Sequence, residues 1–288
     1  MQIPNEILEY CKQTIGVPSG FSPASGGCIN NGGTVKTAQG MFFIKWNDAK
    51  RFPNMFTVES KGLGLLAQTK AIKIPEVMSV YEGESYSCLI LENIQASLKT
   101  SDYNSKLGEG LADIHHHSNE TYGLEHTNYI GSLFQYNHPS ENWPEFFYHQ
   151  RIKPQVDLAL SNKQLSQADA DQFHLLKEKL SQLLPSEKPS LIHGDLWGGN
   201  VMTDSQGEPV LIDPAVAYSH REMDIAMTRL FGSFDQEFYD AYHSSYPLVS
   251  GFEDRLDLYN LYPVLVHVNL FGGSYRNQAM RIVLKYTK

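Results

Sequence analysis

The sequence predicts an α+β protein with two lobes, a small β-rich N-terminal lobe and a larger, mostly helical C-terminal lobe. Short apolar runs separated by turn residues fill the first hundred residues, whereas apolar residues at helical spacing dominate from about Leu98. The 288 residues suit one large domain or two lobes. We expect a nucleotide-binding lobe over residues 1–94 and a catalytic, substrate-binding lobe over 95–288.

Turn residues and apolar spacing predict the elements of the N-terminal lobe. They are a helix capped by Asn5 and ended by Gly16, strands over 34–38 and 41–46 joined by a Gln39-Gly40 turn, a helix over 55–66, and strands over 77–81 and 87–91. The lobe is therefore expected to be mostly antiparallel sheet with one inserted helix.

The C-terminal lobe is expected to begin with a helix over 106–117, on which His115 is interpreted as a structural histidine. A second helix should start at a Ser166 cap and end at Pro185. A strand-rich segment over 190–213 interrupts the helices, and the remainder looks helical again.

Composition excludes several classes of protein. The 41% hydrophobic content excludes a disordered chain, and the net charge of −9 argues against binding of nucleic acid. The stretch 261–271 is interrupted by polar residues, so no membrane span is expected, and the N-terminus shows no signal peptide. The spacing of Cys11, Cys28 and Cys88 fits neither a disulfide framework nor a zinc site. We expect a soluble cytoplasmic protein with reduced thiols.

The most informative segment runs from Leu191 to Asp213. An apolar strand leads into Asp195, Asn200 lies five residues later, and Asp213 follows the return strand. Phosphoryl transfer needs a carboxylate that accepts the proton of the attacking hydroxyl, and oxygen ligands for magnesium. We interpret Asp195 as the base and Asn200 and Asp213 as ligands of Mg²⁺. Taken singly, each would be read as an ordinary turn residue.

These residues resemble the catalytic and metal-binding loops of the protein-kinase-like superfamily. There the catalytic loop reads His-Arg-Asp, with Asn five residues after Asp, and the metal-binding Asp opens Asp-Phe-Gly. Here Gly194 replaces the arginine and Pro214 follows the metal-binding aspartate. The missing arginine and the absence of an Ala-Pro-Glu motif favour a kinase of small molecules.

Lys45 and Glu59 are expected to act together at the nucleotide. Lys45 lies in an otherwise apolar strand, where its charge is costly unless it reaches water or an anion such as a phosphate. Glu59, in the following helix, would pair with Lys45 and position it. The alternatives are an edge lysine that reaches solvent and an ordinary solvated glutamate.

Two further segments are predicted to bind ATP. The glycine-rich stretch with Gly26, Gly27, Cys28 and Ile29 lies where a loop covering the phosphates would lie, although it lacks Gly-x-Gly-x-x-Gly spacing. The segment Glu92-Asn93-Ile94 follows the last predicted strand and would bind adenine through its backbone.

Several segments are similar to those of the fructosamine kinase (ketosamine-3-kinase) family, which is related to the aminoglycoside phosphotransferases. They are residues 26–29, 143–147, 193–200, 213–224 and 239–242. The resemblance extends from about Gly26 to the C-terminus. Two departures are Gly198, where many relatives are expected to have serine, and the segment 231–234, which more often has a second glycine.

The resemblance implies an enzyme that uses ATP and Mg²⁺ to phosphorylate a sugar hydroxyl of a ketosamine, either a fructosamine or a ribulosamine. The phosphate would destabilise the adduct and release the amine, which amounts to deglycation. The substrate would be a small molecule or protein-bound. Trp197, beside the base, would offer an apolar face to the substrate, the alternative being a packed core tryptophan. Glu222 and Asp224 are interpreted as structural residues that tie down loops.

Two other functions remain open from the residues. One is a choline-, homoserine- or aminoglycoside-type phosphotransferase on the same scaffold, and the other is a nucleotide-binding module without catalysis. The family resemblance also raises redox regulation through Cys28, so the protein would be a monomer or a redox-linked homodimer. Cys11 and Cys88 lie on apolar faces and are expected to be inert.

Overall fold

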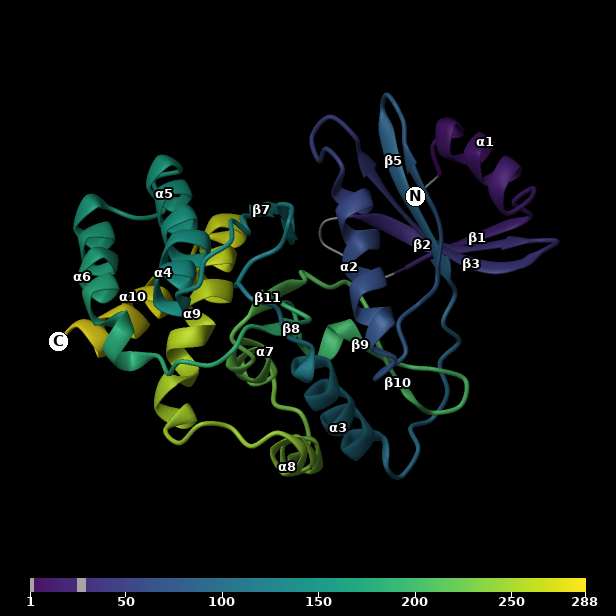
Figure 1. The fold of residues 1–288 in the computed structure, drawn as a ribbon. Coiled ribbons are helices and arrows are strands. Elements are labelled where there is room, and N and C mark those ends of the chain that lie inside the picture. The colour runs from purple at the N-terminus through teal and green to yellow at the C-terminus, as the bar shows by residue number, and fades with distance from the viewer. Residues whose placement is uncertain (1–2, 25–29) are drawn as a thin grey trace. The chain divides into compact units, whose positions relative to one another are not determined.

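The computed structural model describes residues 3–24 and 30–288, and its contacts divide the chain into two compact units (Figure 1). Unit 1 comprises Met1–Tyr103 and Val201–Pro214, and unit 2 comprises Asn104–Asn200 and Ala215–Lys288. The single lobe boundary expected after residue 94 stays a prediction.

Unit 1 is built on a five-stranded antiparallel sheet in the order β1-β2-β3-β5-β4. The strands are β1 (Gly20–Pro23), β2 (Asn31–Thr37), β3 (Gly40–Asp48), β4 (Val77–Glu82) and β5 (Tyr86–Glu92). The four predicted strands are confirmed, and β1 was not expected. The predicted Gln39-Gly40 turn is wrong by one residue, because Gly40 already pairs with Thr37.

Two helices cover the two faces of this sheet (Figure 1). Helix α1 (Asn5–Thr14) buries Ile7 and Cys11 against Ile44 and Trp46 of β3. Because side chains alternate along a strand, Lys45 points to the opposite face, where it meets Glu59 of α2 (Met55–Thr69).

The predicted Asn5 cap is wrong. Helix α1 begins at Asn5 itself, so that Pro4 occupies the capping position, and no side chain caps it. The ring of Pro4 fixes a φ of −57°, and the adjoining ψ of 145° is extended, so the chain turns into the helix directly after it.

A short hairpin completes unit 1. Strands β9 (Val201–Thr203) and β10 (Pro209–Leu211) pair around a turn in which Asp204 accepts the backbone N–H groups of Gln206 and Glu208. Val210 also pairs with Lys73, which precedes β4. The strand-rich segment predicted over 190–213 is thereby confirmed.

Unit 2 is mostly helical. Its helices are α3 (Tyr103–His116), α4 (Trp143–Phe146), α5 (Lys153–Ser161), α6 (Gln167–Leu183), α7 (Glu222–Met227), α8 (Gln236–Ser245), α9 (Phe252–Phe271) and α10 (Ser274–Thr287). A π-helix, η1 (Phe147–Ile152), joins α4 to α5, and a 3₁₀ turn, η2, spans Gly198–Asn200. Its strands pair as β6 (Asn128–Ile130) with β7 (Leu133–Gln135) and β8 (Ser190–Ile192) with β11 (Ala217–Ser219).

Helix α9 forms the centre of unit 2 and packs against α5, α7 and α10. It is apolar around most of its circumference, which is typical of a helix buried on several sides. The predicted Ser166 cap of α6 is confirmed, because the Ser166 hydroxyl accepts the N–H of Asp169. In the part of the chain that the structure describes, no helix combines the length and apolarity needed to cross a membrane.

Candidate active site

Lys45 lies in the middle of the sheet of unit 1, between two carboxylates. Its Nζ lies 2.6 Å from Oε1 of Glu59 and 2.5 Å from Oδ1 of Asp213. Strand β3 is flanked by β2 and β5, so Lys45 is not an edge lysine. Burial disfavours the ammonium charge, but the two carboxylates outweigh it and raise the pKa of Lys45. Lys45 therefore stays protonated, and the predicted pairing with Glu59 is present.

Glu59 and Asp213 differ in their exposure to solvent. The Glu59 side chain is 12% exposed, and loss of hydration raises its pKa despite the neighbouring ammonium group. The Asp213 side chain is 46% exposed, and its backbone adopts a left-handed φ of 54°, which is uncommon outside glycine. Glu59 therefore anchors the lysine from the buried side, whereas Asp213 offers its carboxylate to solvent.

The second group of predicted residues lies on one loop of unit 2. Strand β8 leads into His193-Gly194-Asp195, and the 3₁₀ turn η2 brings Asn200 back beneath the loop. Nδ2 of Asn200 donates to the backbone carbonyl of Asp195 at 2.8 Å and to Oδ2 of Asp195 at 3.0 Å. Since Asn200 is buried, it fixes the carboxylate of Asp195 from inside the unit.

The start of this loop is held by Asp224 of α7. Its Oδ2 accepts the backbone N–H of His193 at 2.7 Å, and its Oδ1 accepts that of Gly194 at 2.8 Å. Gly194 has a φ of 83°, and a Cβ there would overlap the carbonyl oxygen of Ala215. Asp224 thus ties down a loop, as predicted. Glu222 instead pairs with Arg255 of α9, a contact between helices.

Trp197 is exposed and belongs to a row of aromatic side chains on unit 2. Its side chain is the first of the exposed aromatic row, in which Trp197, Phe231 and Phe271 are exposed and His267 and Tyr275 are half-buried. Trp197 is 38% exposed, which argues against the packed core tryptophan that the sequence left open. The other members were not expected, because they come from two parts of the chain that are distant from Trp197.

The departure at Gly198 is harmless in this structure. A Cβ at that position would meet no atom within 4 Å, so the serine expected in relatives would also fit.

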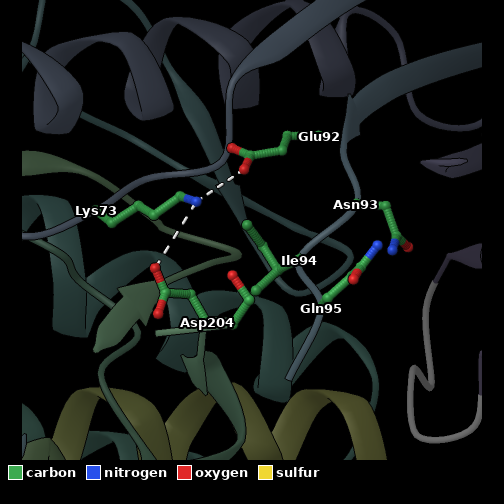
Figure 2. A pocket seen from close by; sticks show the side chains of 7 residues that line it. Lys73, Glu92, Asn93, Ile94, Gln95 and Asp204 are labelled. Atoms are coloured by element: carbon green, nitrogen blue, oxygen red, sulfur yellow. Dashed lines mark hydrogen bonds and ion pairs between the residues drawn. The ribbon is translucent and has the colours of Figure 1, made fainter. Parts of the chain in front are cut away.

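The predicted adenine-binding segment borders a polar pocket of about 290 Å³ in unit 1 (Figure 2). Its lining comprises Lys73, Glu92, Asn93, Ile94, Gln95, Asp204 and Ser205. Figure 2 shows Lys73 between the carboxylates of Glu92 and Asp204, at 2.8 and 3.9 Å. The side chain of Glu92 is therefore engaged in an ion pair.

The backbone and Asn93 define what this segment offers to a base. The N–H of Glu92 donates to the carbonyl of Glu76, and Oδ1 of Asn93 accepts the hydroxyl of Thr34 at 2.8 Å. The adenine hypothesis therefore rests on the Glu92 carbonyl and the backbone of Asn93 and Ile94. The glycine-rich segment Gly26, Gly27, Cys28 and Ile29 lies outside the described residues.

Comparison with known proteins decides the family. The model of the fructosamine kinase family matches residues 3–288. The chain belongs to the fructosamine kinase family. A "Probable ketoamine kinase" of Vibrio parahaemolyticus is 40% identical over 264 residues, covering 91% of this chain and 90% of its own. The ketosamine-3-kinase of Mus musculus is 33% identical over 293 residues, covering 92% and 94%.

Solved structures agree with this fructosamine kinase assignment. A protein of Thermobifida fusca assigned as a fructosamine-3-kinase has a TM-score of 0.88 at 31% identity, covering 98% of this chain and 100% of its own. A spectinomycin phosphotransferase has a TM-score of 0.61 at 17% identity, covering 100% of this chain and 94% of its own. The latter likeness concerns the fold alone.

These findings confirm the predicted fold class and family. The chain has an α+β kinase-like fold, and as a member of the fructosamine kinase family it is a phosphotransferase rather than a nucleotide-binding module without catalysis.

Proposed function

We propose that this fructosamine kinase transfers the γ-phosphoryl group of ATP to a sugar hydroxyl of a ketosamine, using Mg²⁺. The observation that carries the proposal is the hydrogen-bonded pair of Asp195 and Asn200 on the loop that the family motif predicts. In this role Asp195 accepts the proton of the attacking hydroxyl, so that the oxygen can form its bond to phosphorus.

Asp213 and Asn200 carry the oxygen donors proposed for Mg²⁺. Asp213 presents a partly exposed carboxylate, and Asn200 uses its amide nitrogen toward Asp195, which directs its amide oxygen elsewhere. Mg²⁺ held by Asp213 and Asn200 would neutralise charge on the phosphates. Lys45, kept protonated by its two carboxylate partners, would bind the phosphates as a fixed positive charge.

The remaining predicted residues take supporting roles. The backbone of Glu92, Asn93 and Ile94 would bind adenine, and the glycine-rich segment with Gly26, Gly27, Cys28 and Ile29 would cover the phosphates. Trp197 would place the apolar side of the ketosamine next to Asp195, two residues away in the chain. The exposed aromatic row would extend this surface toward the amine-bearing part of the substrate.

The substrate class is proposed to be fructosamines or ribulosamines, free or protein-bound. The relative in mouse is named a ketosamine-3-kinase, and one in Oryza sativa subsp. indica, 38% identical over 277 residues, is named a protein-ribulosamine 3-kinase. The buried thiols of Cys11 and Cys88 support a reducing, cytoplasmic location.

A substrate panel tests this proposal. The purified protein is incubated with ATP, with and without Mg²⁺, and with a fructosamine, a ribulosamine, choline, homoserine or an aminoglycoside, and products are identified by phosphorus NMR. We expect a phosphorylated ketosamine that later releases its free amine. Phosphorylation of an aminoglycoside or choline in preference to both ketosamines would contradict the proposal. The unglycated amine and Asp195→Asn serve as controls.

A further inference from the structure

A buried chain of hydrogen bonds in unit 2 ends at the loop that carries Asp195. Nδ1 of His115 lies 2.8 Å from the Tyr242 hydroxyl, and Nε2 of His115 lies 3.2 Å from Oδ2 of Asp224. His115, Tyr242 and Asp224 are each about 1% exposed. Because Asp224 also accepts the N–H groups of His193 and Gly194, helices α3, α7 and α8 meet the catalytic loop through one carboxylate.

The partners determine which way each hydrogen bond runs. The guanidinium of Arg221 can only donate, and its Nη1 lies 3.2 Å from the Tyr242 hydroxyl, whose oxygen accepts. The hydroxyl proton of Tyr242 is then directed to Nδ1 of His115. The proton on Nε2 of His115 is in turn donated to Asp224. This arrangement needs a neutral imidazole with its proton on Nε2.

The pKa shifts of His115 and Asp224 agree with these hydrogen-bond directions. Burial lowers the pKa of His115, which favours the neutral ring. Burial opposes the charge of Asp224. The hydrogen bonds that Asp224 accepts from His115 and from the backbone N–H of Gly194 outweigh burial and lower the pKa of Asp224. A neutral donor therefore faces an ionised acceptor, the arrangement that makes a strong hydrogen bond.

The hydrogen-bond chain is also fixed at its other end, at Tyr242. Arg221 donates to the backbone carbonyls of Tyr246 and Pro247 and pairs with Glu187 at 2.8 Å. The hydroxyl of Tyr242 is therefore held in place by an arginine that is itself fixed by Glu187 and two backbone carbonyls.

We propose that His115 is a positioning residue for the phosphoryl transfer. Together with Tyr242, it holds the Asp224 carboxylate in the orientation that binds the N–H groups of both His193 and Gly194. The carboxylate in turn fixes the backbone that presents Asp195. This inference rests on the proposed function of Asp195. Oδ2 of Asp224 serves His115 and His193 at once, so loss of the imidazole donor frees the carboxylate to rotate. A shift of about 1 Å in a reacting group costs up to about 100-fold in rate.

The test compares His115→Ala, His115→Gln and Tyr242→Phe with the wild-type enzyme. Glutamine keeps an N–H donor at the ε position, and phenylalanine removes the hydroxyl that donates to Nδ1 of His115 and accepts from Arg221. Tyr148→Phe is the matched control, because it breaks another tyrosine–histidine hydrogen bond of 2.9 Å, to His174, in the same unit. Each variant is assayed for kcat and for both KM values, and amide hydrogen exchange is measured over residues 191–197.

We expect His115→Ala to lower kcat by about 10- to 100-fold while KM for ATP changes less than about twofold. Exchange at residues 193–195 should accelerate. His115→Gln should retain more activity than His115→Ala, Tyr242→Phe should lose less than His115→Ala, and Tyr148→Phe should match the wild type. If His115→Ala does not fold, the glutamine and phenylalanine variants carry the comparison.

Two results would overturn the proposal. One is unchanged exchange at residues 193–195 in folded His115→Ala protein, or in Tyr242→Phe protein where His115→Ala does not fold. The other is a loss of kcat that Tyr148→Phe reproduces, which would indicate general loosening of unit 2. Failure of the wild type to phosphorylate any ketosamine would instead count against the proposed function, since the exchange measurement needs no substrate.

Discussion

The side-chain amide of Asn200 donates to both the carbonyl oxygen and a carboxylate oxygen of Asp195, at 2.8 and 3.0 Å. We expect the Asp195 carboxylate, oriented by this double contact, to act as the base. Asp195→Asn keeps the shape of the side chain but removes the proton acceptor, so we expect kcat to fall by about 10²–10⁴-fold. Steady-state kinetics with the best ketosamine, alongside an unchanged melting temperature, check this. Near-wild-type turnover would mean that another group is the base.

Magnesium dependence should separate Asp213 from Asn200. Asp213→Ala removes a carboxylate ligand and is expected to abolish turnover at every Mg²⁺ concentration. Asn200→Ala removes one amide oxygen, which water can partly replace, so residual activity should return as Mg²⁺ is raised. Titration of turnover against Mg²⁺ measures both. Wild-type behaviour in the two variants would refute the two-ligand hypothesis.

Lys45→Met should raise KM for ATP and lower kcat/KM, because the charge that meets the phosphates is lost while the aliphatic stem remains. The variant also leaves Glu59 buried without its partner, and this costs stability. The double variant Lys45→Met/Glu59→Gln removes that leftover charge and is the proper comparison. Unchanged ATP kinetics in the double variant would give Lys45 a purely structural role.

Asp169 should make the stability of unit 2 depend on pH. Burial works against its charge, but hydrogen bonds from Ser166 and Arg276 outweigh it and lower the pKa of Asp169. A carboxyl group whose pKa is lower in the folded state than in the unfolded state stabilises the fold at pH values above its unfolded pKa of about 3.9. This stabilisation is lost as the pH falls through the pKa of the folded state. Asp169→Asn should therefore lower the melting temperature at pH 7 and have a smaller effect at pH 3, where part of the stabilisation is already lost.

Thermal unfolding between pH 3 and pH 7 measures this difference. Asp171→Asn, on the exposed side of the same helix, is the control and should behave like wild type throughout. A deficit in Asp169→Asn that is equally large at pH 3 and pH 7 would show that shape, not charge, matters at this cap.

Cys28 is the cysteine expected to respond to oxidant. Burial raises the pKa of Cys11 to about 11 and also raises that of Cys88, so neither forms a thiolate readily. Treatment with hydrogen peroxide should inhibit the wild type reversibly and spare Cys28→Ala, and non-reducing electrophoresis should show a dimer that a thiol dissolves. Equal loss of activity in both proteins would exclude Cys28 as the redox site.

Local patterns in the sequence were enough to predict much of the fold and part of the candidate site. Local patterns predicted the strand around Lys45 and the helix after Met55, and the kinase-like motif order then predicted that Lys45 and Glu59 pair. Ser166 was recognisable as a cap because capping depends on residues three positions apart. The Asn5 cap failed because Pro4 occupies that position in the structure.

Contacts between residues that are far apart in the sequence could not be predicted. His115 and Asp224 are 109 residues apart, and nothing in the spacing around either indicates the other. The exposed aromatic row likewise joins three separate segments. The ion pairs of Lys73 with Glu92 and Asp204 are a further example that no local pattern indicates.

The backbone at Gly194 also limits the evolutionary routes open to this chain. A glycine codon can become an arginine codon through one base change, which would turn the loop into the His-Arg-Asp form of protein kinases. Here any side chain would strike the carbonyl of Ala215, and the positive φ would add strain. The loop can therefore accept a side chain at position 194 only if the backbone at Ala215 shifts as well. One base change reaches the arginine codon, but this backbone does not accommodate the arginine without a second adjustment.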